Sequence, residues 1–170
     1  MKSERKEPAE QYYRIASDPF GEILLLSDGR SLTGLHFGPK SRWPELQSQS
    51  SDVSVLKLAA EELCAYFEGR LREFTVPLAF KGTPFQQQVW RTLCDIPYGE
   101  TISYAELARR VGSPQGFRAV GHANGSNPIA IIAPCHRVIA SDGSLGGYGG
   151  GLDRKRWLLA HESETATTFL

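Results

Sequence analysis

The sequence has little cysteine, a single methionine and no long apolar run. Its three cysteines, Cys64, Cys94 and Cys135, are odd in number and widely spaced, which argues against a disulfide framework. No CxxC or Cys/His pair has the spacing of a metal site. No run approaches the roughly 18 apolar residues of a membrane span, and the charged start of the chain lacks a signal-peptide core. We therefore expect no metal, no membrane association and a reducing compartment: the cytoplasm, or the nucleus if the source has one.

The sequence also lacks net charge, because 19 Lys and Arg side chains balance 19 Asp and Glu side chains. The balance is uneven along the chain. Residues 1–79 carry 10 basic and 12 acidic side chains, a net −2, and residues 80–162 carry 9 and 6, a net +3. A solvated surface explains this mild asymmetry about as well as a binding face does. If the protein has an anionic partner, the second half of the chain is expected to contact it.

The length suits one large domain or two small ones. Residues 78–83 form the expected boundary, which predicts one domain over 1–79 and another over 80–170.

The first domain is predicted to be a small antiparallel sheet with a helix. Alternating apolar residues separated by turn residues predict strands over 12–17, 22–27 and 32–37. Apolar residues at helical spacing follow over 55–67, and Asp52 is the expected N-cap of that helix.

The second domain is predicted to be mostly helical. Thr83 and Pro84 fit the N-cap and first position of one helix. Ser103, with Glu106 three residues later, has the pattern of a capping box at the start of the next. A last helix is expected over 153–161.

A helix-turn-helix pattern lies in the middle of this second domain. Helices are expected over 104–111 and 116–124, with a tight Gly-Ser-Pro turn between them. An ordinary helical hairpin explains the pattern about equally well. The second helix, however, is almost free of bulky side chains, so its backbone can approach a partner as closely as a narrow DNA groove requires.

The chemistry is concentrated at Cys135, which follows the apolar run 129–133 and precedes His136 and Arg137. A free cysteine, with a pKa near ~8.5, is mostly protonated at neutral pH, and nearby positive charge with a base favours the nucleophilic thiolate. In an extended segment His136 and Cys135 point to opposite sides, so the imidazole is expected to act through a bend or a bridging water. Glu162 is one of several acids available to orient it.

The glycine-rich segment 143–151 does not have the Lys-Ser/Thr ending of a phosphate-binding loop. We interpret it as a mobile loop with one aromatic side chain. Tyr148 either closes over a planar ligand or packs inward.

Several motifs together resemble the methylated-DNA–protein-cysteine methyltransferases, direct-reversal repair proteins that remove alkyl groups from the O6 position of guanine. The resemblance covers about residues 82–162, with the motifs in order and at family spacing. It implies a ribonuclease-H-like α/β domain followed by a mostly helical domain with a winged-helix-like helix-turn-helix. The matching segments are 99–104, 118–121, 125–128, 134–138 and 157–162.

The resemblance implies a catalytic role for five residues of this sequence. Cys135 matches the alkyl acceptor, which attacks the alkyl carbon directly while guanine leaves. His136 matches a base that acts through water, and Glu162 matches the carboxylate behind it. Tyr104 matches the tyrosine that gives a proton to the departing guanine, and Asn127 matches the asparagine that ties the turn to the cysteine segment. No cofactor is expected, because the DNA carries the alkyl group, and each molecule acts once.

The resemblance also implies binding to the minor groove of double-stranded DNA that carries alkylated guanine, and transfer from O4 of thymine as a further reaction. Arg118 matches the arginine that fills the gap left by a flipped base. We further expect a monomer, and the sequence leaves cooperativity on DNA open. The other DNA-binding residues predicted are Ala119, Ala123, Asn124, Ser103 and Gly121. The substrate-pocket residues predicted are Tyr148, Gly149, Val138, Trp157, Arg137 and Lys155.

Two features depart from the family pattern. Gly149 stands where many relatives carry serine, which predicts a looser pocket that admits larger alkyl groups. His122 and Asn124 are polar where relatives often carry Gly, Ala or Met, which predicts different groove contacts.

Three other functions are compatible with parts of the pattern. A lesion-binding module without transfer is disfavoured by the cysteine itself. A Cys-His hydrolase would turn over repeatedly, and no oxyanion motif supports it. A DNA-binding regulator would protect undamaged DNA, but a single helix-turn-helix makes a poor dimeric repressor.

Overall fold

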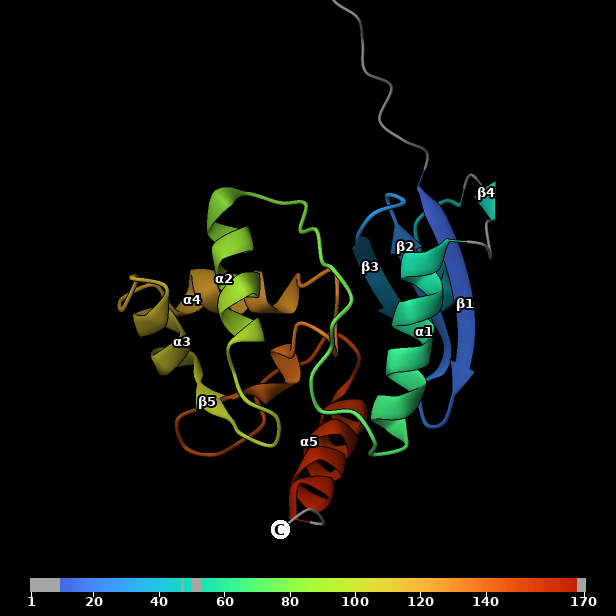
Figure 1. The fold of residues 1–170 in the computed structure, drawn as a ribbon. Coiled ribbons are helices and arrows are strands. Elements are labelled where there is room, and N and C mark those ends of the chain that lie inside the picture. Colours follow the sequence, from blue (N-terminus) through green and yellow to red (C-terminus); the bar gives the residue numbers. More distant parts are fainter. Residues whose placement is uncertain (1–9, 47, 50–52, 168–170) are drawn as a thin grey trace, which may run out of the picture.

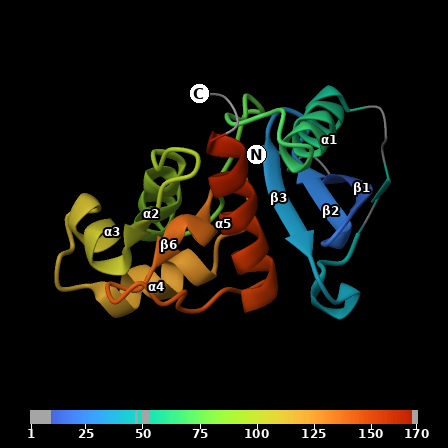
Figure 2. The same ribbon diagram turned by 90° about the horizontal axis from the view of Figure 1, so that it is seen from below.

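The computed structural model describes residues 10–46, 48–49 and 53–167. A sheet with one helix packs beside a group of helices, and the last helix, α5, lies between the two (Figures 1 and 2). The strands are β1 Gln11–Ser17, β2 Gly21–Ser27, β3 Leu32–Phe37, β4 Ser48–Gln49, β5 Ile102–Ser103 and β6 Val138–Ile139. The helices are α1 Ser54–Phe67, α2 Pro84–Cys94, α3 Tyr104–Arg110, α4 Phe117–Gly125 and α5 Leu152–Thr167. Short 3₁₀ turns lie at Lys40–Arg42 and Cys135–Arg137.

The N-terminal sheet has the strand order β3-β2-β1-β4. The antiparallel pairs β1·β2 and β2·β3 confirm the predicted meander, whereas the two-residue β4 pairs with β1 in parallel and was not predicted. Helix α1 packs on this sheet (Figure 1). Its N-cap position is Val53, which makes no side-chain cap, and the predicted cap, Asp52, lies outside the described residues.

The starts of α2 and α3 follow from their capping residues. Thr83 Oγ1 accepts from the Gln86 N–H at 3.2 Å, and Gln86 Oε1 accepts from the Thr83 N–H at 3.0 Å, a complete capping box. Ser103 Oγ accepts from the Glu106 N–H at 3.0 Å, which confirms the predicted N-cap. The predicted capping box is incomplete there, because the Glu106 carboxylate binds Arg109 and Arg110.

The run 129–133 belongs to the core of the N-terminal sheet, although it comes from the second half of the chain. Ile129, Ile131 and Ile132 are buried beside residues of β2, β3 and α1. The Leu35 N–H donates to the Pro128 carbonyl at 2.9 Å, and Leu35 pairs with Ile129 in an isolated bridge. The segment then turns instead of continuing as a strand, and Ile131 has φ 72°, which is strained for a β-branched residue. The sheet thereby fixes the position of the chain just before Cys135.

None of the helices in the described ranges is long and apolar enough to cross a lipid bilayer.

Candidate active site

A cavity of about 420 Å³ lies between the two halves of the molecule. This volume falls in the usual range of roughly 300–1,000 Å³ for small-molecule sites. Strand β3, helices α3 and α4, the turn that carries Cys135 and the glycine-rich loop all contribute to its wall. Of the predicted site residues, the structure brings together at this cavity Tyr104, Gly121, Asn124, Asn127, Cys135, Tyr148 and Gly149.

Cys135 begins a 3₁₀ turn and is held there by Asn127. The Asn127 Nδ2–H donates to the Ala133 carbonyl at 2.7 Å, and Asn127 Oδ1 accepts from the Ile129 N–H at 3.0 Å. The chain coils after Pro134, so the extended geometry considered for Cys135 and His136 does not occur here. Asn127 follows the C-cap of α4, Ser126, and these two hydrogen bonds link it to the segment that leads to Cys135.

The Cys135 thiol is neutral at rest. The side chain is 5 % exposed. Burial raises the pKa of the Cys135 thiol above its ordinary value of 9.0, and the opposing effects of Asn127 and the Lys155 charge are smaller. The sequence had suggested that neighbouring positive charge lowers this pKa. Desolvation outweighs that charge, so a base must take the proton when the sulfur reacts.

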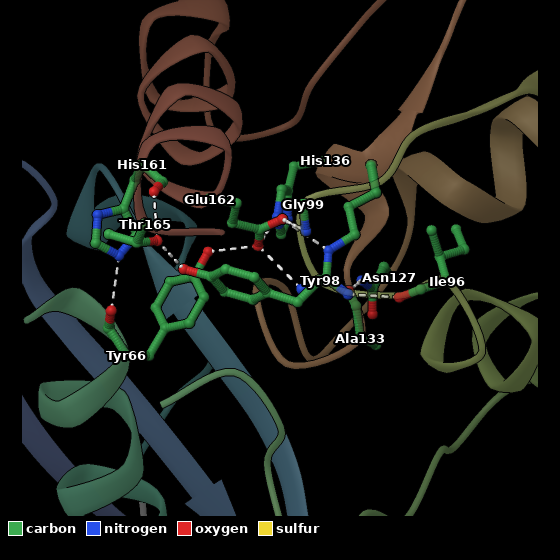
Figure 3. Close-up of polar contacts among 11 residues, drawn as sticks. Tyr66, Ile96, Tyr98, Gly99, Asn127, Ala133, His136, His161, Glu162 and Thr165 are labelled. Atoms are coloured by element: carbon green, nitrogen blue, oxygen red, sulfur yellow. Dashed lines mark hydrogen bonds and ion pairs between the residues drawn. The ribbon is translucent and has the colours of Figure 1, made fainter. Parts of the chain in front are cut away.

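His136 is the neighbouring base, and Glu162 holds it. Its Nε2 lies 2.7 Å from Glu162 Oε1 in a buried pair, and Figure 3 shows the contact. Burial lowers the pKa of His136 below 6.5, against the effect of Glu162, so the imidazole is neutral at pH 7. An ionised carboxylate only accepts, so the Nε2 of His136 carries the proton. Its Nδ1 has no hydrogen-bond partner among the residues that the structure describes, so this nitrogen keeps a free lone pair.

Glu162 is the centre of the buried polar network (Figure 3). Besides His136, it accepts from Tyr66 Oη at 2.7 Å, from Arg137 Nε at 2.9 Å and Nη2 at 3.0 Å, and from the Gly99 N–H at 3.3 Å. Burial alone would raise the pKa of Glu162, but the hydrogen bonds from His136 and Arg137 and the charge of Arg137 hold it far below its usual range. The carboxylate therefore stays ionised and fixes the imidazole.

Tyr104, at the start of α3, supplies a phenol at the cavity. Burial raises its pKa, and the nearby Cys135 adds to the increase, while the Asn124 side chain opposes it. Tyr104 is thus protonated at neutral pH and able to donate. Asn124 is buried beside it, and the Asn124 Nδ2–H donates to the Cys135 carbonyl at 3.5 Å.

Lys155 fixes the glycine-rich loop from α5. Its buried ammonium donates to the carbonyls of Val138 at 2.7 Å, of Gly147 at 3.2 Å and of Leu145. Lys155 was predicted to line the substrate pocket, but it does not line the cavity. Its contacts set the position of the loop that carries Tyr148.

Three other predicted pocket residues also lie outside the lining. Val138 is fully buried in the helical core, and Arg137 is occupied by Glu162 and by the Ile96 carbonyl, which accepts from Nη1 at 2.6 Å. Trp157 packs in the sheet core, stacked on His161 with ring centroids 4.7 Å apart. Their placement in the pocket is corrected: these side chains build the frame behind it.

Helix α4 divides its residues between surface and interior. Arg118 and Ala119 are exposed, and so is Phe117, at 48 %. The prediction that Ala123 contacts DNA is wrong. Its side chain lies in the helical core, and its carbonyl accepts from Trp90 Nε1 at 2.7 Å.

The remaining predicted DNA-binding residues have other surroundings. Gly121 and Asn124 line the cavity, and Ser103 caps α3.

The sequence reasoning missed Tyr66 and the end of β3. Tyr66 is separated from Glu162 by 96 positions, and β3 contributes Leu35, His36 and Phe37 to the cavity. No local signal marks these residues, because only tertiary packing brings them to the site.

Within the described ranges, no cluster of three or more His, Cys, Asp or Glu side chains is placed to hold a metal ion.

Known proteins match both halves of this chain. Residues 84–164 match the model described as 6-O-methylguanine DNA methyltransferase, DNA binding domain, and residues 11–80 match its ribonuclease-like domain. The methylated-DNA–protein-cysteine methyltransferase of Mycobacterium bovis is 48 % identical over 155 residues, which are 91 % of this chain and 94 % of that protein. The chain belongs to the methylated-DNA–protein-cysteine methyltransferase family. Its predicted family and fold class are thus confirmed.

Other members of the family extend the comparison. The methyltransferase of Methanosarcina barkeri is 48 % identical over 152 residues, 89 % of this chain and 96 % of that one. The crystal structure of Mycobacterium tuberculosis OGT in complex with DNA has a TM-score of 0.79 at 47 % identity, covering 91 % of this chain and 94 % of that chain. A second crystal structure, of the Mycobacterium tuberculosis O6-methylguanine methyltransferase, has a TM-score of 0.82 at 45 % identity and covers 95 % of this chain and 99 % of that chain.

Proposed function

We propose that this methyltransferase repairs DNA by direct reversal, moving an alkyl group from O6 of guanine to the Sγ of Cys135. One observation carries the proposal: Cys135 lines a cavity shared with a protonated Tyr104, and the next residue in the chain, the neutral His136, is held by the ionised Glu162. A nucleophile and an acid thereby meet at one cavity, and a base adjoins the nucleophile in the chain. The names of its relatives support the same reaction class.

In the proposed reaction, the thiol proton of Cys135 passes to Nδ1 of His136, directly or through a water. The sulfur attacks the alkyl carbon, the bond from that carbon to O6 breaks, and its electron pair stays on guanine. Tyr104 protonates the departing base and becomes a phenolate, and the imidazolium, stabilised by Glu162, then returns its proton through water to that phenolate. The thioether on Cys135 does not exchange with thiols, so each molecule reacts once.

DNA is proposed to bind across α4, through its minor groove. The exposed Arg118 fills the stack after the damaged base is flipped into the cavity, which otherwise costs a few kcal/mol. Ala119 lies next to it on the exposed surface and lets the helix backbone approach the groove. Such contacts carry little sequence information, so we expect weak sequence preference.

We further propose that O4-alkylated thymine is a second substrate, that the protein acts as a monomer, and that it works in the cytoplasm, or in the nucleus of a eukaryote. A reducing compartment suits a reaction that needs a free thiol at Cys135.

The test of the proposed function is the stoichiometry of transfer. A duplex with one labelled O6-methylguanine, in excess over protein, should release one label per protein molecule and then stop, with guanine restored in the DNA. Cys135→Ser should bind the duplex and transfer nothing. Continued turnover, as a hydrolase would show, or tight binding of the lesion by the wild type without transfer, would contradict the proposal.

Arg118→Ala should slow transfer from duplex DNA by about tenfold while leaving transfer from the free base O6-benzylguanine unchanged, because only the duplex requires a flipped base. Single-turnover rates with the two substrates measure the effect. Arg156→Ala, which removes an exposed arginine from α5, is the matched control and should change neither rate. Equal slowing with both substrates would mean that Arg118 supports the cavity and not the flipped state.

The rate of transfer should be nearly flat between about pH 7 and about pH 8.5. The pKa of His136 lies below 6.5 and that of Cys135 above 9.0, so the neutral thiol and neutral imidazole both persist across this range. Single-turnover rates at saturating protein and constant ionic strength measure the profile. A rise of roughly tenfold per pH unit would instead indicate that a pre-formed thiolate is the reacting species.

A further inference from the structure

We propose that Phe37, at the end of β3, sets the size of the alkyl group that the cavity accepts, so that the N-terminal domain takes part in substrate selection. This inference rests on the proposed function and concerns the same cavity.

The first support is the composition of the cavity wall. Most lining residues are Gly, Ala, Asn or Cys, and the large side chains are Tyr104, Tyr148 and three consecutive residues of β3. Tyr104 is already assigned the role of proton donor to the departing guanine. The bulk that limits an alkyl group therefore comes from Tyr148 and from β3. Burial lowers the pKa of His36, so this wall carries no charge at neutral pH and suits an apolar group.

The second support is the packing of Phe37 against the glycine-rich loop. Its ring stacks on Tyr148 with centroids 6.3 Å apart and an angle of 30° between the planes. A Cβ at Gly150 would lie 2.1 Å from Phe37 Cε2. The Phe37 ring therefore fits only because residue 150 is a glycine. The position of Tyr148 thus depends on the size of residue 37.

The third support is the rigidity of this wall. The edge of the Phe37 ring meets Phe20, with centroids 5.1 Å apart, and the Arg154 guanidinium lies 5.6 Å from its centre. Two positions earlier, Leu35 is hydrogen-bonded to Pro128 and paired with Ile129, in the segment that leads to Cys135. The distance between the wall and the sulfur is therefore fixed by contacts between the two halves. A rigid wall discriminates by size, because it cannot yield to a larger group.

The experiment compares single-turnover transfer from duplexes that contain O6-methylguanine or O6-benzylguanine. In Phe37→Ala and Phe37→Leu the ratio of benzyl to methyl rates should rise, by about tenfold for alanine, since a change of this size in an apolar pocket alters discrimination by at least that factor. Phe37→Trp should lower the ratio, which keeps the test informative if Phe37→Ala folds poorly.

Phe67→Leu is the matched control. Phe67 also packs on Phe20, with centroids 5.3 Å apart, but it does not line the cavity, so its ratio and its methyl rate should equal those of the wild type. A ratio that does not respond to Phe37, or that responds equally to Phe67, overturns the inference. Methyl transfer to wild-type Cys135 is measured in the same assay, and its absence would instead reject the proposed function.

Discussion

Glu162→Gln should lower the free energy of unfolding by about 3–5 kcal/mol, because it leaves the buried Arg137 without its counter-charge. The carboxylate accepts from Arg137 twice and from Tyr66, His136 and Gly99 once each, and the Glu162 side chain is 1 % exposed. A glutamine turns an NH₂ group toward these donors. The expected loss is a large part of the roughly 5–15 kcal/mol that stabilises a typical domain.

Urea unfolding of the two proteins at pH 7 measures this difference. Glu61→Gln, the same change at an exposed position of α1, should stay within about 0.5 kcal/mol of the wild type. The pKa of Glu162 is lowered in the folded state, so its contribution is present above its unfolded value of 4.5 and is lost as pH falls through and below that value. The difference between wild type and Glu162→Gln should therefore shrink in acid. A difference that stays constant down to pH 3, or is absent at pH 7, would contradict the role assigned to this carboxylate.

Tyr104→Phe should slow transfer by about 10²–10⁴-fold, the usual contribution of a general acid, and leave DNA affinity nearly intact. The reason is the leaving group, since guanine departs as a strongly basic anion. Burial keeps the Tyr104 phenol protonated at every pH at which the protein is expected to act. Phenylalanine keeps the ring and its packing and removes only the donor.

Single-turnover rates and equilibrium binding to the same O6-methylguanine duplex separate the two effects. Tyr13→Phe, in β1, removes a hydroxyl that does not line the cavity and should change neither quantity. Parallel losses of rate and affinity in Tyr104→Phe would mean that the residue positions the DNA and does not deliver a proton.

Local chemistry explains what the sequence predicted well. The three long strands and the helix starts at Thr83 and Ser103 depend on alternation, turn residues and capping, all of which are written in short segments. The importance of Cys135 also follows from its own neighbours in the chain. These features need no knowledge of distant contacts.

The errors arise where packing decides. Val120 and Ala123 are three residues apart and share the buried face of α4, a periodicity that could have removed Ala123 from the DNA-binding set. The reactivity of Cys135 was judged from adjacent charge, whereas burial by remote residues determines its pKa.

The contributions of Tyr66 and Phe37 depend on contacts between segments far apart in the chain. Composition and spacing do not encode such contacts, so these two residues emerged only from the structure.

The most direct measurement of the central claim is the position of the transferred carbon. After reaction with an O6-methylguanine duplex, peptide fragmentation by mass spectrometry should find a single added methyl, on Cys135. Cys64 and Cys94 are exposed free thiols and serve as internal controls that should stay unmodified. A methyl on either of these cysteines, or a repaired duplex beside an unmodified Cys135, would contradict the account.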